Sequence, residues 1–513
     1  MISRAPATSN LHLEPGEDEV TLAKLGYKQE FRREFTPLEV SGLAFSYIGV
    51  VPSIVSVFFY ALPNGGPFAM VWGWAIACPF IMCIGLALGE LASAAPTSGG
   101  LYYWTYSLAS PRCRNFLCWI VGYSNTIESI AGVASVNWAC AIQITAAISI
   151  ASGQPYATTN AKIYGIYAAV MLSQAVLVSL GTKVLARLQS LYTLVNLCLC
   201  FIVIIALPIA TPSEYRNSAS FALGNFTNLD GWPSGFAFIL SLMAPLWTIG
   251  GYDASVHMSE EASNAATAIP WAITSSIIIA AVLGWVINVV LAFCMGTDLD
   301  GILNSPLGQP LAQIFYNSLG QRMALVFWCF IISAQYMVSS NCLLVGSRQT
   351  FAFALNTVWF DAACALLIGL LAFVSTQAVN AVFTIGVTAS YISYITPITT
   401  RFVFNNNFKP GPFHLGKFSF PISAIAVTGM VFMNIVFFFP STPQTTAQEM
   451  NYTVVVLGGF MFLAISWYYF PVYGGVHWFN GPIANITPAI TCENRDEDSM
   501  SEKEERDAEV IDV

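Results

Sequence analysis

Residues 43–62 read LAFSYIGVVPSIVSVFFYAL, an apolar run that Gly49 and Pro52 interrupt near its middle. A membrane-spanning α-helix needs about 20 mostly apolar residues. Glycine and proline weaken a helix interior, and freed backbone N–H and C=O groups are costly in lipid unless protein or a polar cavity shelters them. The run therefore predicts a membrane span that is broken between Gly49 and Ser53.

A second apolar run, 234–257, carries a matching interruption, with Pro245 followed by the stretch TIGGY at 248–252. The two runs are the first and sixth along the chain, which correspond if two five-helix halves repeat. Broken helices in corresponding positions are typical of transporter binding sites. Glycine and proline also kink packed membrane helices without forming a site, so this alternative stays open.

The composition agrees with a membrane protein, because 56% of the residues are hydrophobic and only 9% are charged. Ordinary soluble domains are about a quarter charged. Roughly twelve stretches qualify as spans by length and apolarity. They lie near 43–62, 67–91, 116–147, 162–181, 186–209, 234–257, 269–296, 323–350, 357–376, 379–402, 420–440 and 453–475.

Three regions follow from this threading: a polar tail over 1–40, a transmembrane domain over 41–479, and an acidic tail over 480–513. Lysine and arginine gather on the side of the tails, which predicts that both termini are cytosolic. Acidic tails are typically solvated and indicate no nucleic-acid partner. We expect an integral protein of the plasma membrane, whose partners are the lipid bilayer and, at the tails, trafficking or ubiquitin machinery.

The sequence contains few patterns typical of metal sites or enzymes. The twelve cysteines lie mostly within apolar runs and form no CxxC pair, so we interpret them as buried apolar residues. HExxH and GxSxG motifs are absent as well. We therefore predict neither an enzyme nor a metal or cofactor. Of three Asn-x-Ser/Thr sequons, Asn225 is the glycosylation candidate, because Asn451 is crowded against a span and Asn485 is predicted to be cytosolic.

The two breaks predict a substrate site. Amides at the first break could hold an anionic or polar group, since the N-terminus of a half-helix carries partial positive charge. Carbonyls freed at the second break could hold an ammonium, and neighbouring aromatic rings could add cation–π contact. The predicted substrate-binding residues are Gly49, Val50, Ser53, Trp247, Thr248, Gly250, Gly251, Tyr252 and Asp253.

Glu128 lies near the middle of the third span, where a charge costs about 2.5–3.5 kcal/mol on insertion scales. It shares helical spacing with Ser124, Gly132 and Ser135, which predicts one small, polar face. That face suits either close helix packing or a hydrated path. We hypothesise that Glu128 carries a coupling proton, with a structural hydrogen bond as the alternative.

Four segments resemble the fungal GABA, choline and amino-acid permeases of the amino acid/polyamine/organocation superfamily. They are FSYIGVVPSIVS at 45–56, GGPFAMVWGW at 65–74, GELASAAPTSGGLYYW at 89–104 and GGYDASVHMSEEASNAATAIP at 250–270. The resemblance implies an all-α fold of about twelve transmembrane helices, with a LeuT-type 5+5 inverted-repeat core and two further helices. It also implies substrate binding at interrupted helices 1 and 6, and proton-coupled secondary transport. Gating or packing roles are implied for Glu90, Pro96, Gly99, Gly100, Glu260 and Glu261.

One departure from that family lies between the eighth and ninth spans. Relatives carry about twenty cytosolic residues there with an RDGALP-like core, whereas SRQTFAFA at 347–354 runs directly into LNTVW at 355–359. The predicted connection is almost loopless. A missing exon or a splice variant would explain it, and either bears on whether this form transports.

The sequence thus favours a permease that imports an amino acid or related amine such as GABA with protons. Choline is the alternative substrate, because Trp247 and Tyr252 would suit a quaternary ammonium. A non-transporting nutrient sensor is the alternative from another class. Sodium coupling stays open because Ser339 and Ser340 could supply oxygen ligands.

Overall fold

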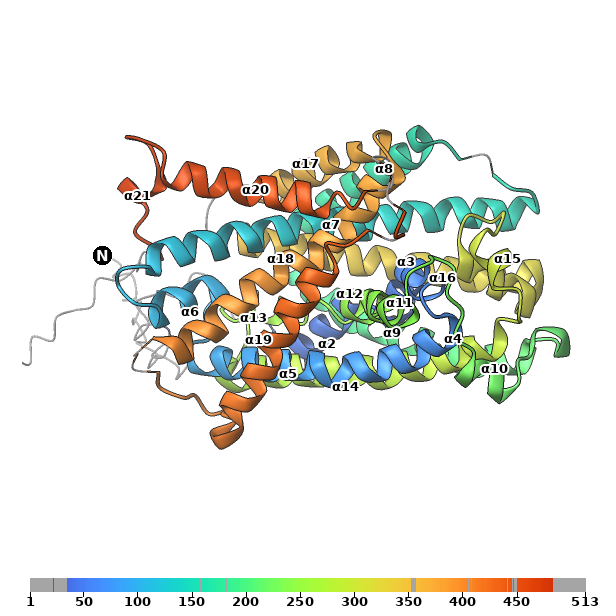
Figure 1. The fold of residues 1–513 in the computed structure, drawn as a ribbon, viewed down its shortest axis with the longest axis horizontal. Coiled ribbons are helices and arrows are strands. Elements are labelled where there is room, and N and C mark those ends of the chain that lie inside the picture. The colour runs from blue at the N-terminus through green and yellow to red at the C-terminus, as the bar shows by residue number, and fades with distance from the viewer. Residues whose placement is uncertain are drawn as a thin grey trace, which may run out of the picture. The chain divides into compact units, whose positions relative to one another are not determined.

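The computed structural model describes Leu22 and residues 35–482, except residues 157, 181, 352–356, 405, 407, 441, 445 and 447–449. Both predicted tails and the predicted loopless connection lie almost entirely outside the described residues. Residues Arg33–Pro482 form one compact unit, and that unit is a bundle of α-helices (Figure 1).

Within the described residues, nine helical segments are long and apolar enough to cross a membrane. They are α2 (Pro37–Ile48) with α3 (Val50–Ala61), α4 (Gly66–Phe68) with η1 (Ala69–Gly73) and α5 (Trp74–Ala94), α7 (Arg114–Ser152), α8 (Asn160–Ser179), α9 (Thr182–Ala210), α14 (Ala265–Cys294), α16 (Pro310–Phe351), α18 (Thr376–Val403) and η4 (Gly416–Phe418) with α19 (Ser419–Val436). Three shorter apolar segments are α11 (Ser234–Ser241) with α12 (Met243–Thr248), α17 (Thr357–Gly369) with η3 (Leu370–Phe373), and α20 (Thr453–Tyr468). Together these segments match the predicted spans in position and confirm the all-α membrane fold.

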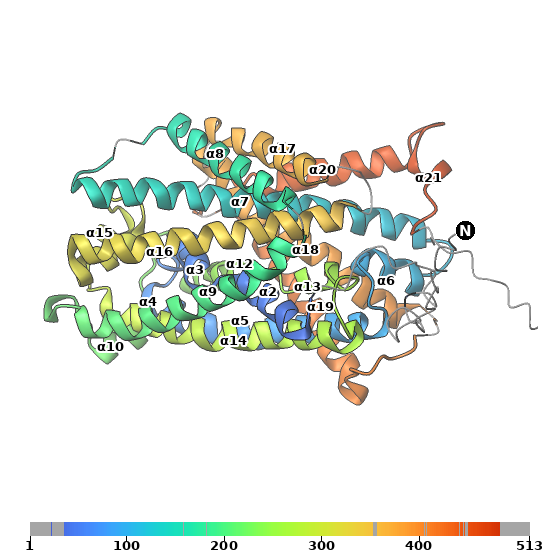
Figure 2. The same ribbon diagram turned by 180° about the vertical axis from the view of Figure 1, so that it is seen from behind.

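Short helices lie at the two ends of the bundle (Figures 1 and 2). One end carries α6 (Gly100–Leu108) and α21 (Gly475–Trp478), and is called the α6 end below; α13 (Ala254–His257) lies between that end and the middle of the bundle. The opposite end carries η2 (Ser213–Tyr215), α10 (Ala219–Gly224) and α15 (Leu299–Leu303), and is called the α15 end.

The buried share of each span distinguishes the central spans of the bundle from the peripheral ones. The most apolar window of the first span is 83% buried, whereas that of the fifth, Arg187–Ala210, is only 28% buried. Large apolar side chains such as Ile209 and Phe462 stay exposed on the outside of the bundle. Lipid is their natural solvent, because apolar faces of membrane helices need no water.

The first span is broken at a single residue. Thr36 and Glu39 form a reciprocal capping box that starts α2, which ends at Gly49 with φ 51° and ψ 70°. The helix resumes at Val50, so the break is narrower than the Gly49–Ser53 interruption that the sequence predicts. Proline explains the difference: Pro52 lies in the first turn of α3, where a missing N–H removes no helical hydrogen bond.

The sixth span is broken over a longer stretch, as predicted. Helix α12 ends at Thr248, and α13 begins only at Ala254. Gly251 in the gap has φ +70°, a conformation that glycine adopts at little cost. The two breaks therefore bring irregular backbone of the first and sixth spans to the middle of the bundle, where α2, α3 and α12 lie together (Figures 1 and 2).

Candidate functional site

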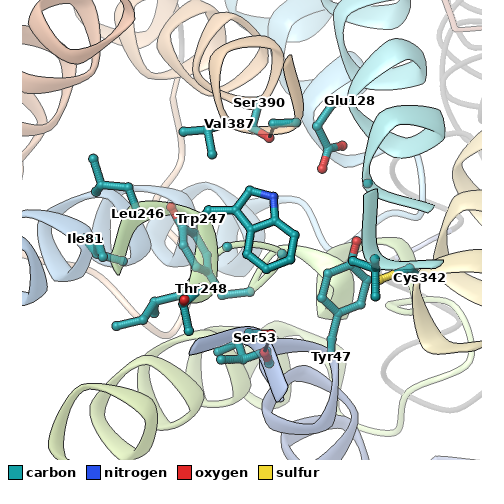
Figure 3. Close-up of a pocket in the computed structure, with 18 of the residues that line it drawn as sticks. Tyr47, Ser53, Ile81, Glu128, Leu246, Trp247, Thr248, Cys342, Val387 and Ser390 are labelled. Atoms are coloured by element: carbon teal, nitrogen blue, oxygen red, sulfur yellow. Dashed lines mark hydrogen bonds between the residues drawn. The ribbon is translucent and has the colours of Figure 1, made fainter. Parts of the chain in front are cut away.

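A cavity of about 70 Å³ lies between the two breaks, and is called the central cavity below. Six spans contribute to its wall, and Figure 3 shows the Trp247 ring and the Glu128 carboxyl pointing into the same space. Its lining is Tyr47, Ile48, Ser53, Ile81, Glu128, Gly132, Val136, Leu246, Trp247, Thr248, Ile249, Gly250, Gly251, Tyr252, Val338, Cys342, Gly386, Val387, Ser390, Tyr391 and Tyr394.

The broken sixth span supplies polar backbone to this wall. The carbonyls of Thr248, Ile249 and Gly250, and the amides of Gly251 and Tyr252, have no hydrogen-bond partner among the described residues. The Thr248 Oγ1 atom is also buried without a partner. A buried polar group without a hydrogen bond costs about 1–3 kcal/mol, so these groups are suited to a polar ligand. The sequence predicts free carbonyls at this break, but the Gly251 carbonyl accepts a hydrogen bond from the Ala254 amide at 3.0 Å.

The first span contributes fewer free groups than the sequence predicts. The Ser53 hydroxyl donates to the Ile48 carbonyl at 2.6 Å, and the Ser53 amide donates to the Gly49 carbonyl at 2.9 Å. Ser53 lines the cavity, but Gly49 and Val50 do not. Gly49 packs instead against α16, where an added Cβ would lie 2.1 Å from Val338 Cγ2.

Glu128, Gly132 and Val136 line the cavity with the four-residue spacing of one helix face. Glu128 faces Ser390 of α18 across the cavity (Figure 3). The predicted polar face is only partly correct: the Ser124 hydroxyl lies 3.6 Å from Met461 Sδ of α20, and the Ser135 hydroxyl donates to the Gly132 carbonyl at 3.1 Å. Neither serine reaches the cavity.

Asp253 lies behind the cavity wall rather than in it, and its side chain is 6% exposed. It lies beside Tyr394 and 3.9 Å from His257 Nε2. The other ring nitrogen, Nδ1, is 3.2 Å from the Ser98 carbonyl. Asp253 therefore links the central cavity to the α6 end instead of forming its surface.

Sequence reasoning missed the contributions of α16 and α18. The missed residues include Cys342, which lies beside the Tyr47 hydroxyl, and Gly386, Ser390 and Tyr394 along one face of α18. Small or polar residues at 386, 390 and 394 recur every four positions, and this spacing was the available signal. Helix α18 is continuous, and the non-helical residue Gly320 in α16 precedes the lining residue Val338 by several turns, so no break marks these lining stretches.

The residues with implied gating roles gather at the α6 end. Glu90 forms a bidentate ion pair with Arg401, with N–O distances of 2.7 and 3.0 Å, and Glu261 pairs with Arg348 at 2.8 Å. Glu260 accepts hydrogen bonds from the amide and hydroxyl of Ser98. Ser98 belongs to the turn that includes Pro96 and Gly99 and leads into α6 at Gly100. These contacts join α5 to α18, α16 to the segment after α13, and that segment to the turn before α6.

Backbone hydrogen bonds add a further connection at the α6 end. The Phe35 amide donates to the Glu261 carbonyl at 3.1 Å, and the Ser263 amide donates to the Phe35 carbonyl at 3.0 Å. The segment before α2 is therefore paired with the segment that follows α13. This pairing joins the α6-end halves of the two broken spans.

Aromatic rings separate the central cavity from the α15 end. The Trp247 and Phe383 ring centroids are 5.3 Å apart, and Phe383 meets Phe59 edge to face at 6.2 Å. Asn225, the glycosylation candidate, lies in the loop after α10 at this end and donates to Thr227 Oγ1 at 2.9 Å. Asn451 is crowded as predicted, because its amide donates to the Phe437 and Phe439 carbonyls.

A helical membrane bundle with a central cavity between two broken spans is typical of membrane transporters. The family model for amino acid permeases matches residues 35–358 and 354–460. The chain is 36% identical to the GABA-specific permease of Saccharomyces cerevisiae over 497 residues, covering 92% of this chain and 86% of that one. The chain therefore belongs to the amino acid permease family.

Other relatives support the same assignment. An uncharacterized amino-acid permease of Schizosaccharomyces pombe is 36% identical over 494 residues, covering 92% of this chain and 89% of that one. Amino-acid permease BAT1 of Arabidopsis thaliana is 32% identical over 506 residues, covering 91% and 96%. The two family-model matches meet at 354–358, where the sequence predicts an almost loopless connection.

Proposed function

We propose that the chain imports an amino acid or related amine such as GABA together with protons. The central cavity carries this proposal: it contains one carboxyl group, Glu128, and none of its lining residues is lysine, arginine or histidine. A solute with a positive end is favoured there, because an unpaired buried charge is costly. One relative bears the name GABA-specific permease, which supports this substrate class.

Both ends of a zwitterion find partners in the cavity. An ammonium group suits the free carbonyls of Thr248 to Gly250 and the faces of Trp247 and Tyr252. A carboxylate suits the amides of Gly251 and Tyr252 and the Thr248 hydroxyl. Backbone groups fix both ends without a basic side chain, so a small solute is bound with little discrimination against related amines.

The orientation follows from the predicted cytosolic tails, which make the α6 end cytosolic. The ion pairs of Glu90 and Glu261 then close the cytosolic side, and the rings of Trp247, Phe383 and Phe59 cover the outer side. Alternating access requires the two barriers to open in turn. A plasma-membrane location supports import of external solutes.

Glu128 is the proposed proton carrier, because it is the titratable carboxyl that lines the cavity and faces Ser390. Proton-coupled uptake is faster at acidic external pH, since the proton gradient then adds to the driving force. In Glu128→Gln we expect this acceleration to disappear, together with a smaller loss of affinity because the one carboxyl of the cavity lining is gone. The acceleration is measured as the rate of uptake of labelled GABA at external pH values of about 5 and about 7. Retention of the full acidic stimulation by the variant contradicts the assignment.

Choline is a second candidate, favoured by the two aromatic side chains Trp247 and Tyr252 that line the cavity. A quaternary ammonium offers no N–H to the free carbonyls, so it would depend on ring contacts alone. A nutrient sensor would bind the same solutes without accumulating them.

One uptake experiment separates these possibilities. Cells lacking their own permeases express this chain, or a form with a twenty-residue loop inserted at 354–356, and receive labelled GABA, choline or single amino acids with and without a proton uncoupler. We expect uncoupler-sensitive accumulation of GABA or an amino acid, without competition by choline. Sodium-dependent uptake, choline accumulation, or no accumulation in either form would each overturn the proposal.

A further inference from the structure

A second cavity, of about 220 Å³, lies toward the α15 end and is called the outer cavity below. It is larger than the central cavity, and different residues line it. They are Phe59, Tyr60, Pro63, Asn64, Asp230, Leu240, Met243, Gln377, Asn380, Ala381, Thr384, Phe437, Phe439 and Asn451. The lining therefore combines aromatic rings, four amide side chains and a single acid.

Backbone contacts hold Asp230 at this cavity. The preceding residue, Leu229, donates its amide to the Pro63 carbonyl at 2.8 Å, and Asn228 forms a bridge with Asn64 at the end of α3. On the other side, the Trp232 ring nitrogen donates to the Pro440 carbonyl at 3.2 Å. The acid thus lies on a loop that is attached to two separate walls of the cavity.

Asn64 supplies an independent indication of a ligand. Its residue surface is only 4% exposed, and its Nδ2 donates to the Tyr60 carbonyl at 3.1 Å. Its Oδ1 atom is buried and has no hydrogen-bond partner among the described residues. An orphaned buried acceptor beside an acid needs a donor. A donor that also carries positive charge satisfies both groups.

The chemistry of the lining identifies the donor. None of the lining residues is lysine, arginine or histidine, so no basic side chain offsets the charge of Asp230. The rings of Phe59, Tyr60, Phe437 and Phe439 offer apolar and cation–π surface. Such a combination favours an organic ammonium over a hydrated metal ion, which prefers several oxygen ligands.

The two cavities lie in series. Phe59 lines the outer cavity and Trp247 lines the central cavity, and Phe383 contacts both rings. Movement of these three rings would connect the cavities. A solute entering from the α15 end therefore meets Asp230 before it meets Glu128.

We propose that the outer cavity is a second binding site, where Asp230 and Asn64 hold the ammonium group of an amine solute before it passes the aromatic partition. This inference rests on the proposed import of amines and adds an entry site to it. The site concentrates amines at the partition and disfavours solutes that carry only negative charge, since like charges repel in a cavity of limited solvation.

The site has its own pH dependence. Partial burial raises the pKa of the Asp230 carboxyl above its usual value, although the nearby Asn64 side chain opposes the shift. Tyr60 is the other titratable group in the lining. Binding of ammonium requires the ionised carboxylate, so it strengthens as pH rises through the pKa of Asp230 and weakens below it. This trend is opposite to the effect expected for proton-coupled transport.

Kinetics of labelled GABA uptake test the site with three variants. In Asp230→Asn we expect the KM at pH 7 to rise by about three- to tenfold, with the maximal rate within about twofold of wild type. Asp230→Glu should restore most of the affinity. The matched control is Glu214→Gln, since Glu214 is an exposed acid at the same end and lines neither cavity. At pH 5 the difference in KM between Asp230→Asn and wild type should be smaller than at pH 7.

Equilibrium binding of labelled GABA to the purified full chain is measured alongside the uptake kinetics. If wild type accumulates no amine, the proposed function fails, and weaker binding by Asp230→Asn alone still supports the outer site. A KM and a binding constant in Asp230→Asn that equal those of wild type overturn the site. An equal rise of the KM in Glu214→Gln also overturns the outer site, because the effect then comes from general surface charge.

Discussion

Arg401→Met should lower the free energy of unfolding by about 3–5 kcal/mol, because it leaves a buried carboxylate without its counter-charge. Glu90 is 1% exposed and receives two hydrogen bonds from the guanidinium and one from Ser419 at 2.7 Å. The guanidinium also lies 3.9 Å from the centre of the Phe408 ring. In detergent, the midpoint of thermal unfolding should fall by about 3–5 °C.

Two further variants distinguish the ion pair from loss of an arginine in general. Arg322→Met removes an exposed arginine at the opposite end and should leave the midpoint within about 2 °C of wild type. Adding Glu90→Gln to Arg401→Met should recover part of the loss, since a neutral amide costs less to bury. Equal midpoints for Arg401→Met and Arg322→Met would show that the pair does not stabilise the fold.

Gly251→Ala should reduce uptake of the transported solute by at least about tenfold, with the protein still at the cell surface. An added Cβ would lie 1.9 Å from the Tyr47 ring, and the backbone φ of +70° is unfavourable for alanine. Overpacking costs about 1–3 kcal/mol and a left-handed residue about 1–2 kcal/mol more. Either the Tyr47 ring moves into the central cavity or the broken segment shifts, and both change the binding geometry.

Gly308→Ala separates backbone strain from the clash with Tyr47. Gly308 has a φ of +76°, but nothing lies within 4 Å of an added Cβ. Its uptake should stay within about twofold of wild type. Surface biotinylation and initial rates of uptake are measured for both variants. Normal uptake by Gly251→Ala would show that the cavity does not depend on this close approach.

The sequence predicts the fold well because each span carries its own signal. Twenty apolar residues in a chain with few charges restrict the backbone to helices across a bilayer. The break in 234–257 is also predictable, since two adjacent glycines follow a proline. The width of the first break is not predictable in this way. It depends on Pro52 lying in the first turn of a new helix, where proline is well tolerated.

The candidate site is predicted only where local irregularity marks it. Trp247, Thr248 and Tyr252 flank a break, and Glu128 is a charge in an apolar run, so each is conspicuous on its own. Tyr394 and Cys342 lie in regular helical stretches, and only the packing of α16 and α18 brings them to the cavity. Asp253 was placed in the site because it follows the break, yet the turn into α13 directs it toward His257.

The αL residue Gly49 joins the two helical segments α2 and α3. Since Phe35 is hydrogen-bonded to Glu261 and Ser263, a tilt of α2 has to carry the chain after α13 along with it. We therefore expect the two half-helices to move together as one body, with hinges at Gly49 and at residues 249–253. If the α6 end is cytosolic, as proposed, we expect both half-helices to move together when that end opens.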